Sequence, residues 1–137
     1  MNGGQTDWRE LFFSSAGRLS RTPFLITAAI LIAATGLYEG IVDDTVHWLT
    51  GWFVYPLMLF CAACVVSKRL HDRGRSGWWA GLVLLAFVVV WPHPHGFFDL
   101  LFLLVLIWAV VELGVMPGEQ GANRYGPNPV RPAAPAT

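Results

Sequence analysis

The sequence predicts an all-α membrane protein with four transmembrane helices. Hydrophobic residues make up 55% of the 137-residue chain and charged residues only 13%, whereas soluble domains contain about 25% charged residues. Four apolar stretches approach the roughly 20 residues that span a bilayer. All lysines and arginines fall in three segments outside these stretches. Because basic loops are retained in the cytoplasm, only an even number of spans places all three segments on one side.

Residues 1–22 are predicted to be cytoplasmic and to contain a short amphipathic helix. Apolar side chains recur there at helical spacing, at Trp8, Leu11, Phe12, Ala16 and Leu19. Polar side chains occupy the other face, so we expect this helix to lie in the headgroup layer of the membrane. Thr22 is the expected cap of the next helix, with Pro23 at its first position.

Residues 23–117 are predicted to form the transmembrane domain, with helices at about 23–42, 46–67, 77–92 and 98–116. The third helix has the shortest apolar run, and Pro56 is expected to kink the second. The loop 68–77 between the second and third helices is strongly basic. Residues 118–137 form a cytoplasmic tail, and its proline-rich end beyond Pro129 is expected to be disordered.

Small residues indicate where the helices approach each other. Gly36 and Gly40 are spaced four apart, as are Gly77 and Gly81, and this spacing allows close backbone contact. We expect these contacts within one chain in preference to a homodimer. Cys61 and Cys64 have the spacing of a redox motif but lie within an apolar helix, which favours buried, reduced cysteines.

Three motifs outside the apolar stretches carry a family resemblance. They are FSSAGRLSRTPF at residues 13–24, KRLHDRGRSGWW at 68–79 and GEQGANRYGPNP at 118–129. Together, in this order and at this helix spacing, they resemble the bacterial inner-membrane family known as domain of unknown function 805. The resemblance covers the chain from about Trp8 to Pro129.

The resemblance implies a compact four-helix protein of the bacterial inner membrane whose motifs meet at the cytoplasmic face. It implies no reaction. The positions that it marks as important are Gly17, Arg18, Ser20 and Arg21 in the first motif, Arg69, Leu70, His71, Asp72, Ser76, Gly77 and Trp78 in the second, and Gly121, Asn123, Arg124, Tyr125, Gly126 and Pro127 in the third.

The loop 68–77 contains more than membrane retention requires. Positive charge alone sets orientation, yet this loop also carries His71, Asp72 and Ser76. Asp72 is expected to pair with Arg69 at helical spacing, and Ser76 lies at a helix N-terminus, where the helix dipole favours an anion. The hypothesis is an anion-binding face, with generic attraction to anionic lipid as the simpler explanation. Its candidate ligand-binding residues are Arg18, Arg21, Arg69, His71, Asp72, Arg75, Ser76, Asn123, Arg124 and Tyr125.

Glu112 lies in the fourth helix, near its cytoplasmic end. We expect it to pair with Arg18 or Arg69, with proton or cation handling as the alternative. Glu39 lies near the outer end of the first helix. His47, His93 and His95 with nearby aspartates show no metal-ligand spacing, so no metal site is predicted.

The function that these observations favour is non-enzymatic, through a basic cytoplasmic face that docks anionic phospholipid headgroups or a protein partner. A small transporter or channel is one alternative. An enzyme or binding protein for a phosphorylated lipid or nucleotide is the other, and it requires His71, Asp72 and Ser76 to meet. No cofactor and no nucleic acid partner are predicted, and a homo-oligomer stays open.

Overall fold

The computed structural model describes residues 7–91 and 93–131, and within these residues the chain is helical, with no strand. In chain order the elements are α1 (Trp8–Phe13), α2 (Arg21–Ile41), α3 (Asp44–Asp72), α4 (Trp79–Val90), α5 (Phe97–Ala109) and the π-helical η1 (Val110–Val115), which continues α5. Three helical segments are long and apolar enough to cross a membrane: α2, α3, and α5 with η1. The fourth, α4, is apolar but shorter.

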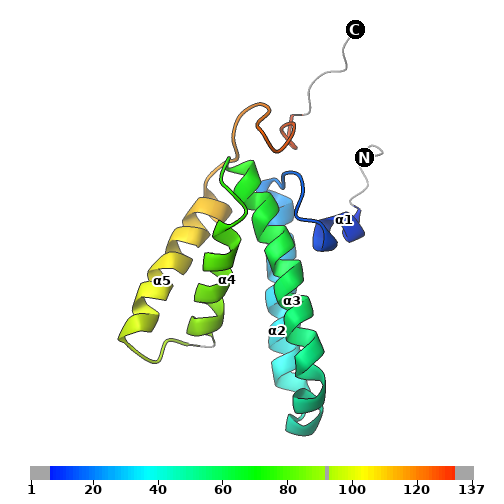
Figure 1. Cartoon of the computed structure of the whole chain (residues 1–137), viewed down its shortest axis with the longest axis vertical. Coiled ribbons are helices and arrows are strands. Elements are labelled where there is room, and N and C mark those ends of the chain that lie inside the picture. The colour runs from blue at the N-terminus through cyan, green and yellow to red at the C-terminus, as the bar shows by residue number, and fades with distance from the viewer. Residues whose placement is uncertain (1–6, 92, 132–137) are drawn as a thin grey trace.

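The helices form two hairpins, α2 with α3 and α4 with α5 (Figure 1). The hairpins meet at the end of the molecule where α3 ends, and they diverge towards the other end (Figure 1). We call the first end, which also carries α1 and residues 116–131, the arginine end. The connections between α2 and α3 and between α4 and α5 lie at the opposite end, called the far end below.

The first helices begin and end at other residues than expected. α1 ends at Phe13, so the prediction of helical spacing as far as Leu19 is wrong. The chain turns at Gly17, whose φ of 90° lies in the left-handed region that glycine tolerates. Ser20, and not Thr22, precedes α2, which begins at Arg21.

The second predicted helix extends into the predicted basic loop. Asp43 caps α3 by accepting hydrogen bonds from the backbone N–H groups of Thr45 (3.0 Å) and Val46 (3.2 Å), and the helix continues through Asp72. Tertiary packing explains the extension, since residues 67–70 are all buried. The connection to α4, which begins at Trp79, is correspondingly short. Pro92, the expected end of the third helix, lies outside the described residues.

The packed core lies at the arginine end. Its buried side chains come from α1, the α1–α2 connection, α2, α3, α4 and α5 with η1: Leu11, Leu19, Phe24, Val65, Leu70, Ala80, Val83, Ala109 and Leu113. Elsewhere the helices present large apolar side chains outwards, such as Trp52 and Phe53, each 77% exposed. Such surfaces are stable in contact with lipid.

Only one of the four paired glycines makes the close contact that the sequence led us to expect. A Cβ at Gly77 would touch Ser67 and His71 at 3.0 to 3.3 Å. Within the described part of the chain, Gly36, Gly40 and Gly81 have no such neighbour within 4 Å. The expectation of contacts within one chain is therefore wrong for these three residues. Cys61 and Cys64 are buried and reduced, as predicted.

Candidate functional site

Three segments that are distant in the sequence meet at the arginine end. The α1–α2 connection joins the end of α3 through the Leu19 N–H, which donates to the Lys68 carbonyl at 3.1 Å. The C-terminal segment joins the same helix end through the Glu119 N–H, which donates to the Asp72 carbonyl at 2.8 Å. Each of the three sequence motifs thus contributes to one structural unit.

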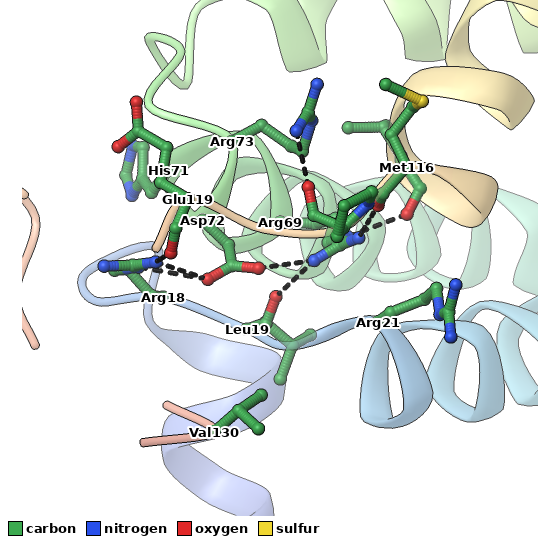
Figure 2. Close-up of polar contacts among 12 residues, drawn as sticks. Arg18, Leu19, Arg21, Arg69, His71, Asp72, Arg73, Met116, Glu119 and Val130 are labelled. Carbon is green, nitrogen blue, oxygen red and sulfur yellow. Dashed lines mark hydrogen bonds and ion pairs between the residues drawn. The ribbon is translucent and has the colours of Figure 1, made fainter. Parts of the chain in front are cut away.

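Arg69 lies at the centre of this unit and is completely buried. Its Nε donates to the Leu113 carbonyl at 2.7 Å and its Nη2 to the Met116 carbonyl at 2.7 Å. Its Nη1 donates to the Leu19 carbonyl at 3.4 Å and to the Asp72 carboxylate at 2.5 Å (Figure 2). A guanidinium carries five N–H donors, and these contacts use most of them. Arg69 therefore ties α3 to the end of η1 and to the α1–α2 connection.

Asp72 is shared by two arginines. Its Oδ2 accepts from Arg69, as predicted from the helical spacing, and its Oδ1 accepts from Nε and Nη2 of Arg18, both at 3.0 Å (Figure 2). The remaining donors of Arg18 reach the carbonyl oxygens of Glu119 (2.8 Å), Gly121 (2.7 Å) and Gly126 (3.3 Å). We call Arg18, Arg69 and Asp72 the arginine cluster.

The C-terminal segment passes close to this cluster. A Cβ added at Gly118 would overlap the Asp72 carboxylate. Only glycine therefore lets the backbone pass at this position without moving the carboxylate away from Arg18 and Arg69.

An aromatic stack holds the third motif. The rings of His71 and Tyr125 are parallel, 3.8 Å apart between centroids, and His71 Nδ1 donates to the Gly17 carbonyl at 3.0 Å. The Asn123 side-chain amide donates to the His71 carbonyl at 2.9 Å. Paired backbone hydrogen bonds between Asn123 and Gly126, both 3.0 Å, close the tight turn that presents Tyr125.

Glu112 pairs with arginines of the α3–α4 connection. Its Oε1 accepts from Arg75 at 2.8 Å and from Arg73 at 3.1 to 3.2 Å. The expected partners, Arg18 and Arg69, are wrong because the arginine cluster and backbone carbonyls already occupy their donors. Glu112 therefore forms ion pairs, as predicted, but with other arginines. Arg75 also lies over the Trp108 ring.

A polar recess of about 360 Å³ opens at the edge of the arginine cluster, and Asp72 and Glu119 are among the residues that line it. The N-terminal turn of α2 forms one wall, with Ser20, Arg21 and Thr22, and the C-terminal segment forms the other. Arg131 belongs to that second wall and is exposed. Arg21 is held in place by donating to the Val115 carbonyl at 3.1 Å.

The structure thus brings the predicted ligand residues to one end but gives them different surroundings. Arg18, Arg69 and Asp72 are enclosed in the cluster, and His71, Asn123 and Tyr125 form the stack. Ser76 accepts from the Trp78 N–H at 3.4 Å, and Arg124 lies over the Tyr125 ring. Arg131 and Glu119 were missed, because only the fold of the C-terminal segment brings them here.

Comparison with known proteins gives a family match. The model of the family described as "Protein of unknown function (DUF805)" matches residues 12–127, which include the first two motifs and the third as far as Pro127. The chain belongs to the DUF805 family. It is 33% identical over 129 residues to the Escherichia coli K12 protein named "Uncharacterized protein YiiR", covering 86% of this chain and 87% of the relative.

A second relative of this DUF805 protein carries a location in its name. It is "Inner membrane protein YhaH" of E. coli K12, 30% identical over 77 residues, which cover 56% of this chain and 50% of that protein. No solved structure matches the chain. With the apolar helices, these relatives identify the chain as a membrane protein of a family without an assigned activity.

Proposed function

We propose that this chain is a non-enzymatic, four-span protein of the bacterial inner membrane that docks anionic phospholipid headgroups at its cytoplasmic face. All nine lysines and arginines lie on segments at the arginine end. This asymmetry supports a cytoplasmic arginine end and a cytoplasmic location of both termini. The exposed Trp8 and Phe13 on α1 support a position of that helix in the headgroup layer.

The docking site in this proposal is the recess beside α2. Two arginines flank it, and the N-terminal turn of α2 adds backbone N–H groups and the Ser20 and Thr22 hydroxyls. Ser20 makes no side-chain cap to the helix, so its hydroxyl is available to an incoming oxygen. Phosphate oxygens match this set of donors, since a guanidinium and a helix N-terminus both favour an anion.

The observation that carries the proposal is that two arginines are held by internal contacts while two others line the recess. Arg18 and Arg69 are held by Asp72 and by backbone carbonyls, which leaves Arg21 and Arg131 as the cations that line the recess. The cluster next to the recess then acts as a rigid support. The enzyme alternative is less favoured because Asp72, His71 and Ser76 have separate partners.

Native mass spectrometry of the detergent-purified protein, incubated with phosphatidylglycerol or phosphatidylcholine of equal chain length, tests the proposal. We expect retention of phosphatidylglycerol. An Arg131→Gln variant should weaken it by about fivefold, as expected for the loss of about 1 kcal/mol per basic residue, and an Arg21→Gln, Arg131→Gln variant by more.

The matched control is Arg9→Gln, which removes the same charge from an exposed position on α1. A site in the recess predicts that Arg9→Gln has a smaller effect than Arg131→Gln. Equal losses in the two variants would instead mean generic attraction to the basic surface, and the recess proposal would fail.

A further inference from the structure

An apolar groove of about 250 Å³ separates the two helical hairpins. α2 and α3 form one wall, and α4 and α5 form the other, where the hairpins diverge (Figure 1). Apart from Thr35 and Tyr55, every lining residue is Ala, Val, Leu, Ile, Met, Phe or Trp. Hydrocarbon is the natural filling of such a groove in a bilayer, because apolar cavities do not hold water well.

Tyr55 connects this groove to a polar cluster near the far end. Its side chain lines the groove, and its hydroxyl donates to the Glu39 carboxylate. His47 Nε2 lies 2.6 Å from the same hydroxyl and 3.7 Å from Glu39 Oε1. Tyr38, whose hydroxyl lies 2.8 Å from Thr50 Oγ1, packs against both rings. The Glu39 carboxylate is thus held by Tyr55, with His47 beside it, and stays 39% exposed.

The charge around Glu39 is one-sided. Among the described residues, the one ion-pair partner of Glu39 is the His47 ring, which is charged only when protonated. The sequence contains no lysine or arginine between residues 22 and 67 or between 76 and 123. A carboxylate that has no lysine or arginine partner is stabilised by a cation that also donates hydrogen bonds. A ligand that combines such a cation with a long apolar chain fits both the polar cluster and the groove.

We propose that the groove between the hairpins binds a phospholipid with a primary ammonium headgroup, such as phosphatidylethanolamine. One acyl chain lies between α2–α3 and α4–α5, and the ammonium group contacts Glu39. Tyr55 and His47 position the carboxylate. This site is at the opposite end from the anion recess and uses none of its residues, so either proposal can fail alone.

Competition among three phospholipids of identical acyl chains tests the ligand. The full-length protein in detergent is incubated with equal amounts of phosphatidylethanolamine, phosphatidylcholine and phosphatidylglycerol, and bound species are counted by native mass spectrometry. We expect phosphatidylethanolamine to be retained over phosphatidylcholine, which lacks the N–H donors. Glu39→Gln should reduce that preference by about tenfold, and Asp44→Asn, an exposed acid of the same end, should leave it unchanged.

A groove-filling substitution tests the acyl chain. Ala62 lines the groove, so Ala62→Leu should reduce retention of phosphatidylethanolamine and phosphatidylcholine alike without changing their ratio. Ala62→Val provides a smaller step if the leucine variant loses helical circular dichroism. An unchanged lipid ratio in Glu39→Gln overturns the proposal. So does a lipid-free dimer that Ala62→Leu converts to a monomer, since a second copy would then occupy the groove.

Discussion

The arginine cluster concentrates buried charge in very few residues. Arg69 is fully buried and Asp72 is 3% exposed, and within the described residues every buried side-chain nitrogen and oxygen has a hydrogen-bond partner. Buried ions are tolerated only when paired and hydrogen-bonded in this way. The cost of removing one partner is consequently high, because the other ions remain buried without compensation.

Asp72→Asn is expected to destabilise the protein by about 3–5 kcal/mol, the range for breaking a buried ion pair. Both Arg18 and Arg69 then lose their only carboxylate partner among the described contacts. Thermal unfolding in detergent, followed by tryptophan fluorescence, measures the effect.

Two further variants separate this effect from a general sensitivity to substitution. Asp44→Asn removes the same charge at an exposed position and should leave the unfolding temperature within about a degree of the original. Gly118→Ala keeps all charges but places a methyl group on the Asp72 carboxylate, so it should destabilise too. A stable Asp72→Asn protein would show that the cluster contributes little.

Among the elements, the C-terminal segment depends most on contacts with the rest of the chain. Residues 116–131 contain no helix within the described part of the chain, and the turn at Asn123–Gly126 needs the φ of 133° at Gly126. Its hydrogen bonds and the stack of Tyr125 on His71 hold it against α3. The segment therefore forms one wall of the recess only while these contacts persist.

Tyr125→Ala is expected to release this segment from α3. Aromatic pairs contribute about 0.5–1.5 kcal/mol beyond their buried area, and Arg124 also loses the ring over which it lies. Limited trypsin digestion measures the release, since cleavage after Arg124 should accelerate several-fold while the helices stay intact.

Tyr125→Phe is the matched control because it retains the ring and removes only the hydroxyl. Its cleavage rate should equal that of the unmodified protein. Equal rates in Tyr125→Ala and the unmodified protein would mean that the backbone hydrogen bonds of Asn123 and Gly126 are sufficient to hold the segment.

For the whole molecule, packing and charge coincide at the arginine end. The buried core, the ion pairs made by arginines and all basic segments lie there, whereas the two hairpins diverge towards the far end. A membrane protein with this distribution has one rigid, charged end and a far end whose helices face lipid over much of their surface.

Cysteine labelling in intact cells tests the proposed four-span topology. Single Asp44→Cys and His95→Cys variants place a thiol at the far-end start of α3 and on the α4–α5 connection, and Gln120→Cys places one at the arginine end. We expect a membrane-impermeant maleimide to label the first two in intact cells and Gln120→Cys only after permeabilisation. Background is low because Cys61 and Cys64 are buried.

His95→Cys decides whether α4 and α5 cross the membrane. α4 has only 12 residues, or about 18 Å of helix, which is short for about 30 Å of hydrocarbon. Labelling of His95→Cys only after permeabilisation would contradict a crossing hairpin and leave two spans.

The sequence was sufficient for several features that depend on local pattern. Apolar runs located the long helices, and the i, i+3 spacing located the pair of Arg69 with Asp72. It was insufficient for partners that are distant along the chain. Glu112 pairs with Arg73 and Arg75 and not with Arg18 or Arg69, and periodicity contains no information on which arginine another segment already occupies.

By itself the sequence determined an all-helical membrane chain of the DUF805 family, with its lysines and arginines confined to three segments, because hydropathy and motif order are properties of the linear chain. Only the tertiary structure decided how those charges are used. The side chains of Arg18, Arg69 and Asp72 are enclosed and bind one another and the backbone. Arg21 and Arg131 instead line an open recess. Whether a cation binds a ligand or its own chain depends on which carbonyls and carboxylates folding brings within hydrogen-bonding distance.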